Sequence, residues 1–178
     1  MEIWETSLVR EIQSGEEEAF ERCYRLLSPQ VYSSIFKICG NHDTANELMQ
    51  DTFIDVYESI RSFTPNKSFV GWVKRIAYNN TISFLRKNQR LVLNEALIAE
   101  QESDEYIHCE LEDTQLLDKV LSQVSESERL VLWLFIVEQY NHREIGEMLG
   151  YSASYSKSLL SRVLKRMKSS SEVKSYAL

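Results

Sequence analysis

The chain has 178 residues, which is enough for one domain or two small ones and not for more. Five Gly and two Pro, together with frequent Leu, Glu, Ser and Ile, favour an all-helical protein and disfavour a sheet protein. The formal net charge is -7, no apolar run could span a membrane, and no basic region with a following apolar stretch opens the chain. We therefore expect a cytoplasmic protein with no membrane insertion of its own.

Helical periodicity predicts five helices in the first half of the chain, over 2–14, 16–27, 28–40, 41–60 and 68–88. Gly15 and Gly40 fall where the pattern breaks, so each is expected just beyond a helix. Ser28 and Pro29 suit the cap and the first position of a new helix, and Ser68 can cap the last one. Residues 63–67, with the sequence FTPNK, form a predicted turn.

The predicted helix over 41–60 has the clearest amphipathic pattern in the chain. Its apolar stripe consists of Ala45, Leu48, Met49, Thr52, Phe53, Val56, Tyr57 and Ile60. Its opposite face is acidic and consists of Glu47, Asp51, Asp55 and Glu58, with Ile54 exposed among them. A solvated face and a docking face for a basic partner both explain this pattern, and the pattern alone favours the solvated face.

A basic zone follows, because residues 61–94 contain seven Lys or Arg and no acid. The expected buried stripe of helix 68–88 is Phe69, Trp72, Val73, Ile76 and Ala77. The side expected to be exposed contains Lys74, Arg75, Tyr78 and Asn79. Rings and amides can hold unpaired bases while cations hold phosphates, so this side suits single-stranded nucleic acid.

Residues 95–113 contain eight acids and no Lys or Arg, and 89–113 lack a sustained helical stripe, so we expect an acidic linker there. Beyond it, periodicity predicts helices at 114–124, 127–138, 143–149 and 153–168. After Met148, six bases stand against a single acid. Two basic zones therefore flank the linker, which suggests two contacts with a polyanion.

The last two predicted helices have the pattern of a helix-turn-helix. Gly150 suits the end of the first helix, and Ser152 can cap the second. The inner face of the second helix is Leu160, Val163, Leu164 and Met167. Candidate contacts to duplex DNA are Ser154, Tyr155, Lys157, Ser158, Ser161, Arg162, Lys165 and Arg166. An ordinary helical hairpin with a solvated face is the alternative.

Three segments resemble a bacterial extracytoplasmic-function sigma factor in order and spacing: DTANELMQDTFIDVYESI, FVGWVKRIAYNNTISFLRK and the C-terminal helix-turn-helix. The resemblance covers about residues 16–168. It implies two small helical domains joined by a flexible acidic linker. The first domain would bind the RNA polymerase core and the melted promoter element, and the second would read an upstream promoter element as duplex.

The resemblance also implies roles for residues. The docking surface for a coiled coil on the largest polymerase subunit is matched by Glu47, Gln50, Asp51, Ile54 and Asp55. Residues 63–68 match the loop that, with the next helix, captures a flipped-out base, and Asn79 matches a frequent recognition amide. Candidates for the melted element are Asn66, Lys67, Lys74, Arg75, Tyr78, Asn79, Arg86 and Lys87. The chain departs from the family at three positions, where Tyr155, Ser156 and Leu159 stand in place of the usual Thr, Val and Arg. These departures bear on which sequence of the upstream promoter element is preferred.

We expect a first domain over 1–90, a linker over 91–113 and a second domain over 114–178. No catalytic triad, metal cluster or phosphate-cradling glycine loop is visible, so neither enzymatic activity nor a cofactor is expected. The scattered Cys23, Cys39 and Cys109 fit reduced thiols. Expected partners are core polymerase, promoter DNA and, as is usual in the family, an anti-sigma factor. The alternatives are a helix-turn-helix regulator that never joins polymerase and an acidic helical adaptor that binds only proteins.

Overall fold

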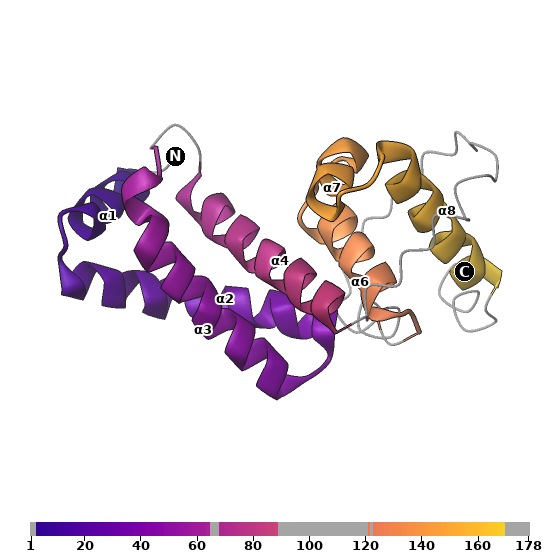
Figure 1. The fold of residues 1–178 in the computed structure, drawn as a ribbon, viewed down its shortest axis with the longest axis horizontal. Helices are drawn as coiled ribbons and strands as arrows, with labels where there is room; N and C mark the ends of the chain where they lie inside the picture. The colour runs from indigo at the N-terminus through magenta and orange to yellow at the C-terminus, as the bar shows by residue number, and fades with distance from the viewer. Residues whose placement is uncertain (1–2, 65–67, 89–120, 122, 170–178) are drawn as a thin grey trace, which may run out of the picture. The chain divides into compact units, whose positions relative to one another are not determined.

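The computed structural model describes residues 3–64, 68–88, 121 and 123–169. They belong to two compact units that divide between Phe84 and Leu85, and Figure 1 shows the helices of each. Every regular element in these ranges is helical, which confirms the all-α fold class. The same ranges contain no helix that is both long and apolar enough to cross a membrane. The predicted domain limits stay a prediction, because residues 89–120 lie outside the described part of the chain.

The N-terminal unit consists of α1 (Ile3–Gln13), α2 (Glu17–Cys39), α3 (His42–Ser59), the short 3-10 helix η1 (Ile60–Ser62) and all but the last three residues of α4 (Phe69–Lys87). Gly40 ends α2 with a φ of 68°. The side chain of Asn41 then caps α3 by accepting a hydrogen bond from the backbone N–H of Thr44 at 2.9 Å. α2 and α3 run antiparallel, because the rings of Tyr24 and Phe53 meet with centroids 4.8 Å apart and those of Phe20 and Tyr57 meet at 5.1 Å.

α2 runs unbroken through Pro29, whereas the sequence predicts two helices that meet there. A proline inside a helix removes one backbone hydrogen bond and crowds the preceding turn, at a cost of about 3 kcal/mol. Cys23, Leu27, Val31 and Ile35 are buried at intervals of four residues, on both sides of the proline. Burying an aliphatic side chain of this size stabilises the fold by roughly 1.5–3 kcal/mol, so a few such side chains offset the proline.

α4 begins where the sequence predicts. The backbone N–H of Gly71 donates to the hydroxyl of Ser68 at 3.2 Å, which confirms the predicted cap. Just before and after this start, the rings of Phe63, Phe69 and Trp72 form a cluster with centroids 5.0–5.9 Å apart. Phe69 has 0% of its surface exposed, so the start of α4 is fixed in the core of the N-terminal unit.

The C-terminal unit contains α6 (Glu126–Leu132), the π-helical segment η3 (Trp133–Val137), α7 (His142–Leu149) and α8 (Ala153–Ser169). The sequence predicts one helix over 127–138; the structure instead widens its second half into a π-helix, which periodicity cannot distinguish from an α-helix over so few residues. The predicted helix over 114–124 lies almost entirely outside the described residues. Both α6 and α7 begin with a capping box, formed by Ser125 with Glu128 and by Asn141 with Glu144.

The turn between α7 and α8 has the geometry that a helix-turn-helix requires (Figure 1). Gly150 ends α7 with a φ of 68°, and the hydroxyl of Ser152 accepts a hydrogen bond from the backbone N–H of Tyr155 at 3.1 Å. Gly146 allows the chain to return close to α7. A Cβ atom at this position would lie 2.7 Å from the backbone oxygen of Tyr151. The φ of Gly150 and the hydrogen bond to the Ser152 hydroxyl confirm the roles that the sequence predicts for these two residues.

Candidate nucleic-acid interface

One side of α4 is exposed and polar. Arg75, Asn79, Ser83 and Arg86 are all exposed and are spaced by four, four and three residues, so they share one face of the helix. The sequence predicts three of these as strand contacts; Ser83 shares their face but is not among the predicted contacts, and only its helical spacing from Asn79 indicates it. Trp72 lies beside this face and is half-buried, although the sequence places it in the buried stripe.

Tyr78 does not belong to this exposed face. The sequence predicts an exposed ring beside Asn79, and this prediction is wrong, because Tyr78 has 0% of its surface exposed. Successive residues of a helix are turned by about 100° from each other, and Tyr78 falls on the buried side. Of the other candidates for the melted element, Lys87 is exposed, while Asn66 and Lys67 lie outside the described residues.

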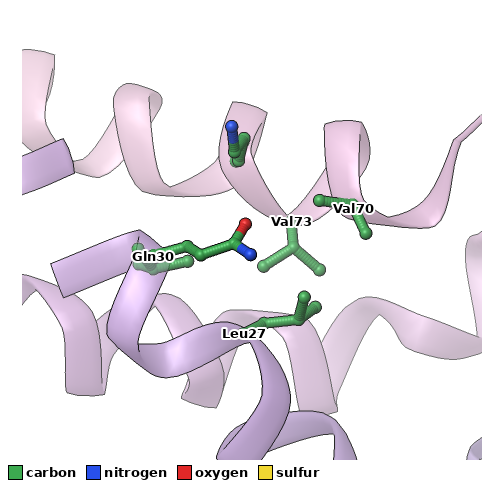
Figure 2. A pocket seen from close by; sticks show the side chains of 6 residues that line it. Leu27, Gln30, Val70 and Val73 are labelled. Atoms are coloured by element: carbon green, nitrogen blue, oxygen red, sulfur yellow. The ribbon is translucent and has the colours of Figure 1, made fainter. Parts of the chain in front are cut away.

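Lys74 lies away from the exposed face and lines a small depression between α2 and α4. Figure 2 shows Leu27 and Gln30 of α2 and Val70 and Val73 of α4 around this depression. It has no room for even a water molecule, so we interpret the depression as a packing feature and not as a ligand site. The described ranges also hold no group of three or more His, Cys, Asp or Glu that could bind a metal ion.

α3 presents an exposed acidic face. Glu47, Gln50, Asp51 and Ile54 are exposed, and the helix contains no Lys or Arg. Ile54 has 55% of its surface exposed, so an apolar side chain lies among carboxylates. Such a face suits a protein partner with basic and apolar side chains. Tyr57, which the sequence places in the buried stripe, is 58% exposed, so that prediction is wrong, although its ring still contacts the ring of Phe20 on α2.

Asp55, the fifth predicted docking residue, is half-buried at the edge of this acidic face. Its Oδ2 atom accepts a hydrogen bond from Nδ2 of Asn80 on α4 at 2.7 Å. Its backbone carbonyl accepts a hydrogen bond from the hydroxyl of Ser59. The Asp55 side chain is therefore turned toward α4, a contact that sequence periodicity does not reveal because the two partners belong to different helices.

The polar face of α8 contains most of the predicted duplex contacts. Its members are Ser154 and Lys165, which are exposed, and Lys157, Ser158, Ser161 and Arg162, which are half-buried. Their spacing places them along one side of the helix, as predicted. α8 contains no acidic residue, so this face is available to phosphate without local repulsion.

Two of the predicted duplex contacts lie elsewhere. Tyr155 has 1% of its surface exposed, so its prediction as a surface contact is wrong. Arg166 donates from both Nη atoms to the two carboxylate oxygens of Glu128 on α6, at 3.0 and 2.9 Å. Burial raises the pKa of Glu128, but the hydrogen bonds and charge of Arg166, with a backbone hydrogen bond from Ser125, outweigh it and leave the pKa below its ordinary value. Arg166 thus joins α8 to α6, and its charge is already paired.

His142 joins α7 to α8. Its ring stacks on Phe135 with centroids 4.6 Å apart, and its Nδ1 atom lies 3.1 Å from the hydroxyl of the buried Ser156. Burial, and then the charge of Lys157, lower the pKa of His142 below its ordinary value. The neutral imidazole is therefore favoured at the joint of the helix-turn-helix.

Two family models match the chain, Sigma-70 region 2 over residues 23–91 and Sigma-70 region 4 over residues 114–167, which together exceed half of its length. The chain is 24% identical over 175 residues to the ECF RNA polymerase sigma factor SigW of Bacillus subtilis, covering 91% of this chain and 94% of the relative. It is also 24% identical to SigM of the same organism, covering 83% and 92%. The chain belongs to the extracytoplasmic-function sigma factors. The resemblance of the sequence to this family is thereby confirmed.

Two solved structures have the same fold as this sigma factor. The sigma factor RpoE of Bartonella quintana, in a co-crystal with the anti-sigma factor NepR, is 23% identical with a TM-score of 0.55, over 84% of this chain and 94% of that one. CnrH, in complex with the cytosolic domain of CnrY, is 16% identical with a TM-score of 0.57, over 92% and 94%. The region 2 match includes all of α3 and α4, and the region 4 match includes α6 and α7 and nearly all of α8. The sigma factor is thus a transcription initiation factor that contains both of the matched regions, region 2 and region 4.

Proposed function

We propose that this sigma factor divides its contacts among three helix faces. The acidic face of α3 binds the coiled coil of the largest polymerase subunit, the exposed face of α4 holds the melted promoter strand, and the polar face of α8 reads duplex DNA. Charge segregation supports this division most strongly: α3 contains no Lys or Arg, whereas α4 and α8 contain no Asp or Glu. Phosphates require cations, and a basic protein surface requires carboxylates.

In this proposal the polymerase performs the chemistry, and the sigma factor selects the promoter and helps to open it. Its compartment is the cytoplasm, because the polymerase and the chromosome are there. An anti-sigma partner belongs to the same proposal, since the resemblance implies one and both similar solved structures contain a second protein.

The docking face is tested by Asp51→Arg. Asp51 is exposed, so the fold should remain intact, while an added positive charge should repel a basic partner and weaken binding of core polymerase. The matched control is Glu18→Arg, the same charge change at an exposed acid of α2. Affinity for core polymerase and transcription on genomic fragments are measured. Wild-type affinity of Asp51→Arg, with an unchanged circular dichroism spectrum, would show that the docking face is misassigned.

The duplex face is tested by Lys165→Gln, because Lys165 is the most accessible base of the polar face of α8. We expect weaker binding to duplex promoter DNA and a salt dependence whose slope is shallower by about 1, as for one lost phosphate contact. Arg25→Gln, at an exposed base of α2, is the control. An unchanged affinity and slope for Lys165→Gln would remove this face from the proposal.

A further inference from the structure

Asn79 and Asn80 are adjacent on α4 but face different ways. Successive helix residues are turned by about 100°, so Asn79 is exposed while Asn80 is half-buried. The Asn80 side chain reaches α3, where its Nδ2 atom lies 2.7 Å from Oδ2 of Asp55. A carboxylate only accepts hydrogen bonds, so the amide atom that faces it is the NH₂ group. This contact directly joins the helix that contains the acidic face to the helix that contains the strand-binding face.

The Asp55–Asn80 hydrogen bond is suited to fixing the rotation of α4. Much of the remaining packing of α4 is apolar, with Phe69 and Val73 both at 0% exposure. Apolar contacts have no preferred direction, whereas a hydrogen bond to a carboxylate has a preferred distance and angle and is about twice as strong as a neutral one. Side-chain tips lie roughly 5–6 Å from a helix axis, so a rotation of about 10–20° would move the Asn79 amide by about 1–2 Å.

We propose that Asp55 and Asn80 form a positioning pair, which holds α4 in the rotation at which Asn79 and Arg75 face an unpaired strand. Asp55 is then not a docking residue. Its carboxylate is half-buried and bonded to α4, whereas Asp51, one turn earlier, is exposed on the acidic face. This inference rests on the proposed strand-binding role of α4.

Three variants separate positioning from docking. Asn80→Ala and Asp55→Ala each remove the hydrogen bond, whereas Asp55→Asn removes the charge and keeps an oxygen that can accept from Asn80. Each is assembled with core polymerase and tested on pre-melted templates of a promoter mapped for this factor, with all four bases tried at each melted position. We expect the two alanine variants to lose about 5- to 30-fold in base discrimination, with polymerase affinity within about twofold of wild type. Asp55→Asn should retain most of the discrimination.

Asp51→Asn is the matched control, because it removes the same charge one turn away. We expect Asp51→Asn to weaken polymerase binding and Asp55→Asn to leave that binding unchanged. A double-mutant cycle in urea unfolding measures the Asp55–Asn80 bond without polymerase, and a non-additive result is expected. An additive cycle, or a loss of polymerase affinity in Asp55→Asn as large as in Asp51→Asn, would overturn the pair. Absence of base discrimination in the wild-type holoenzyme would refute the proposed strand-binding face, and with it the positioning role, even if the cycle were non-additive.

Discussion

Gly146→Ala should destabilise the helix-turn-helix, although alanine is the better helix former. The added Cβ would lie 2.7 Å from the backbone oxygen of Tyr151 and 3.0–3.1 Å from backbone atoms of Ser152 and Ala153. Backbone atoms cannot move aside as a flexible side chain does, and overpacking of this kind typically costs about 1–3 kcal/mol. The gain from replacing Gly by Ala inside a helix is at most about 1 kcal/mol. Because the 2.7 Å contact is with backbone, the cost lies in the upper part of that range, so the expected net loss is about 1–2 kcal/mol.

Hydrogen exchange of the full chain is the appropriate assay, because it reports the stability of each unit separately. Protection of amides in α7 and α8 should fall by about 5- to 30-fold, and that of α2 and α3 should not change. Affinity for duplex promoter DNA should fall as well, because the start of α8 must shift. Gly71→Ala is the control: its Cβ would lie 3.6 Å from Ser68, an ordinary contact, so α4 should keep or gain stability. Undiminished protection of α7 and α8 in Gly146→Ala would refute the packing argument.

Three further predictions concern single side chains. Burial raises the pKa of Cys23 to about 12, so a thiol reagent should leave Cys23 unlabelled in the native protein at neutral pH and label it after denaturation. Glu128→Gln keeps a capping-box side chain but removes the ion pair with Arg166, so it should cost about 0.2–1 kcal/mol in unfolding experiments near pH 7. Because the pKa of Glu128 is lowered in the folded protein, this cost should diminish as pH falls through that lowered pKa. The pKa of His142 is below its ordinary 6.5, so the unfolded chain takes up protons first as pH falls. Stability should therefore decline below about pH 6.5, and His142→Gln should flatten that decline in unfolding measured from pH 7.5 to 5.

Local signals predicted the elements that position the candidate faces. Asn41 and Ser68 cap α3 and α4, and Gly150 ends α7, where their residue types indicate. These positions depend on hydrogen bonds and backbone angles within a few residues, so the sequence alone specifies them. The exposed acidic residues of α3 follow from helical spacing in the same way.

Side-chain contacts between helices could not be predicted from periodicity. Tyr78 and Tyr155 each have an apolar ring and a polar hydroxyl, so helical spacing alone does not decide whether they face the core or the solvent. The pairing of Arg166 with Glu128 joins residues 38 positions apart in the sequence. Local spacing contains no information about which side chain of another helix will lie opposite.

The two capping boxes also affect how a duplex can approach the C-terminal unit. The start of a helix has a partial positive charge of roughly one half, and carboxylates in the first turn neutralise it. α6 begins with Glu126 and Glu128 and α7 with Glu144, whereas α8 has no acid in its first turn. Carboxylates therefore offset the helix dipole at the starts of α6 and α7, whereas the start of α8, beside Ser154, has no such carboxylate. The helix dipoles of this unit thus favour one orientation on a duplex before any base is read.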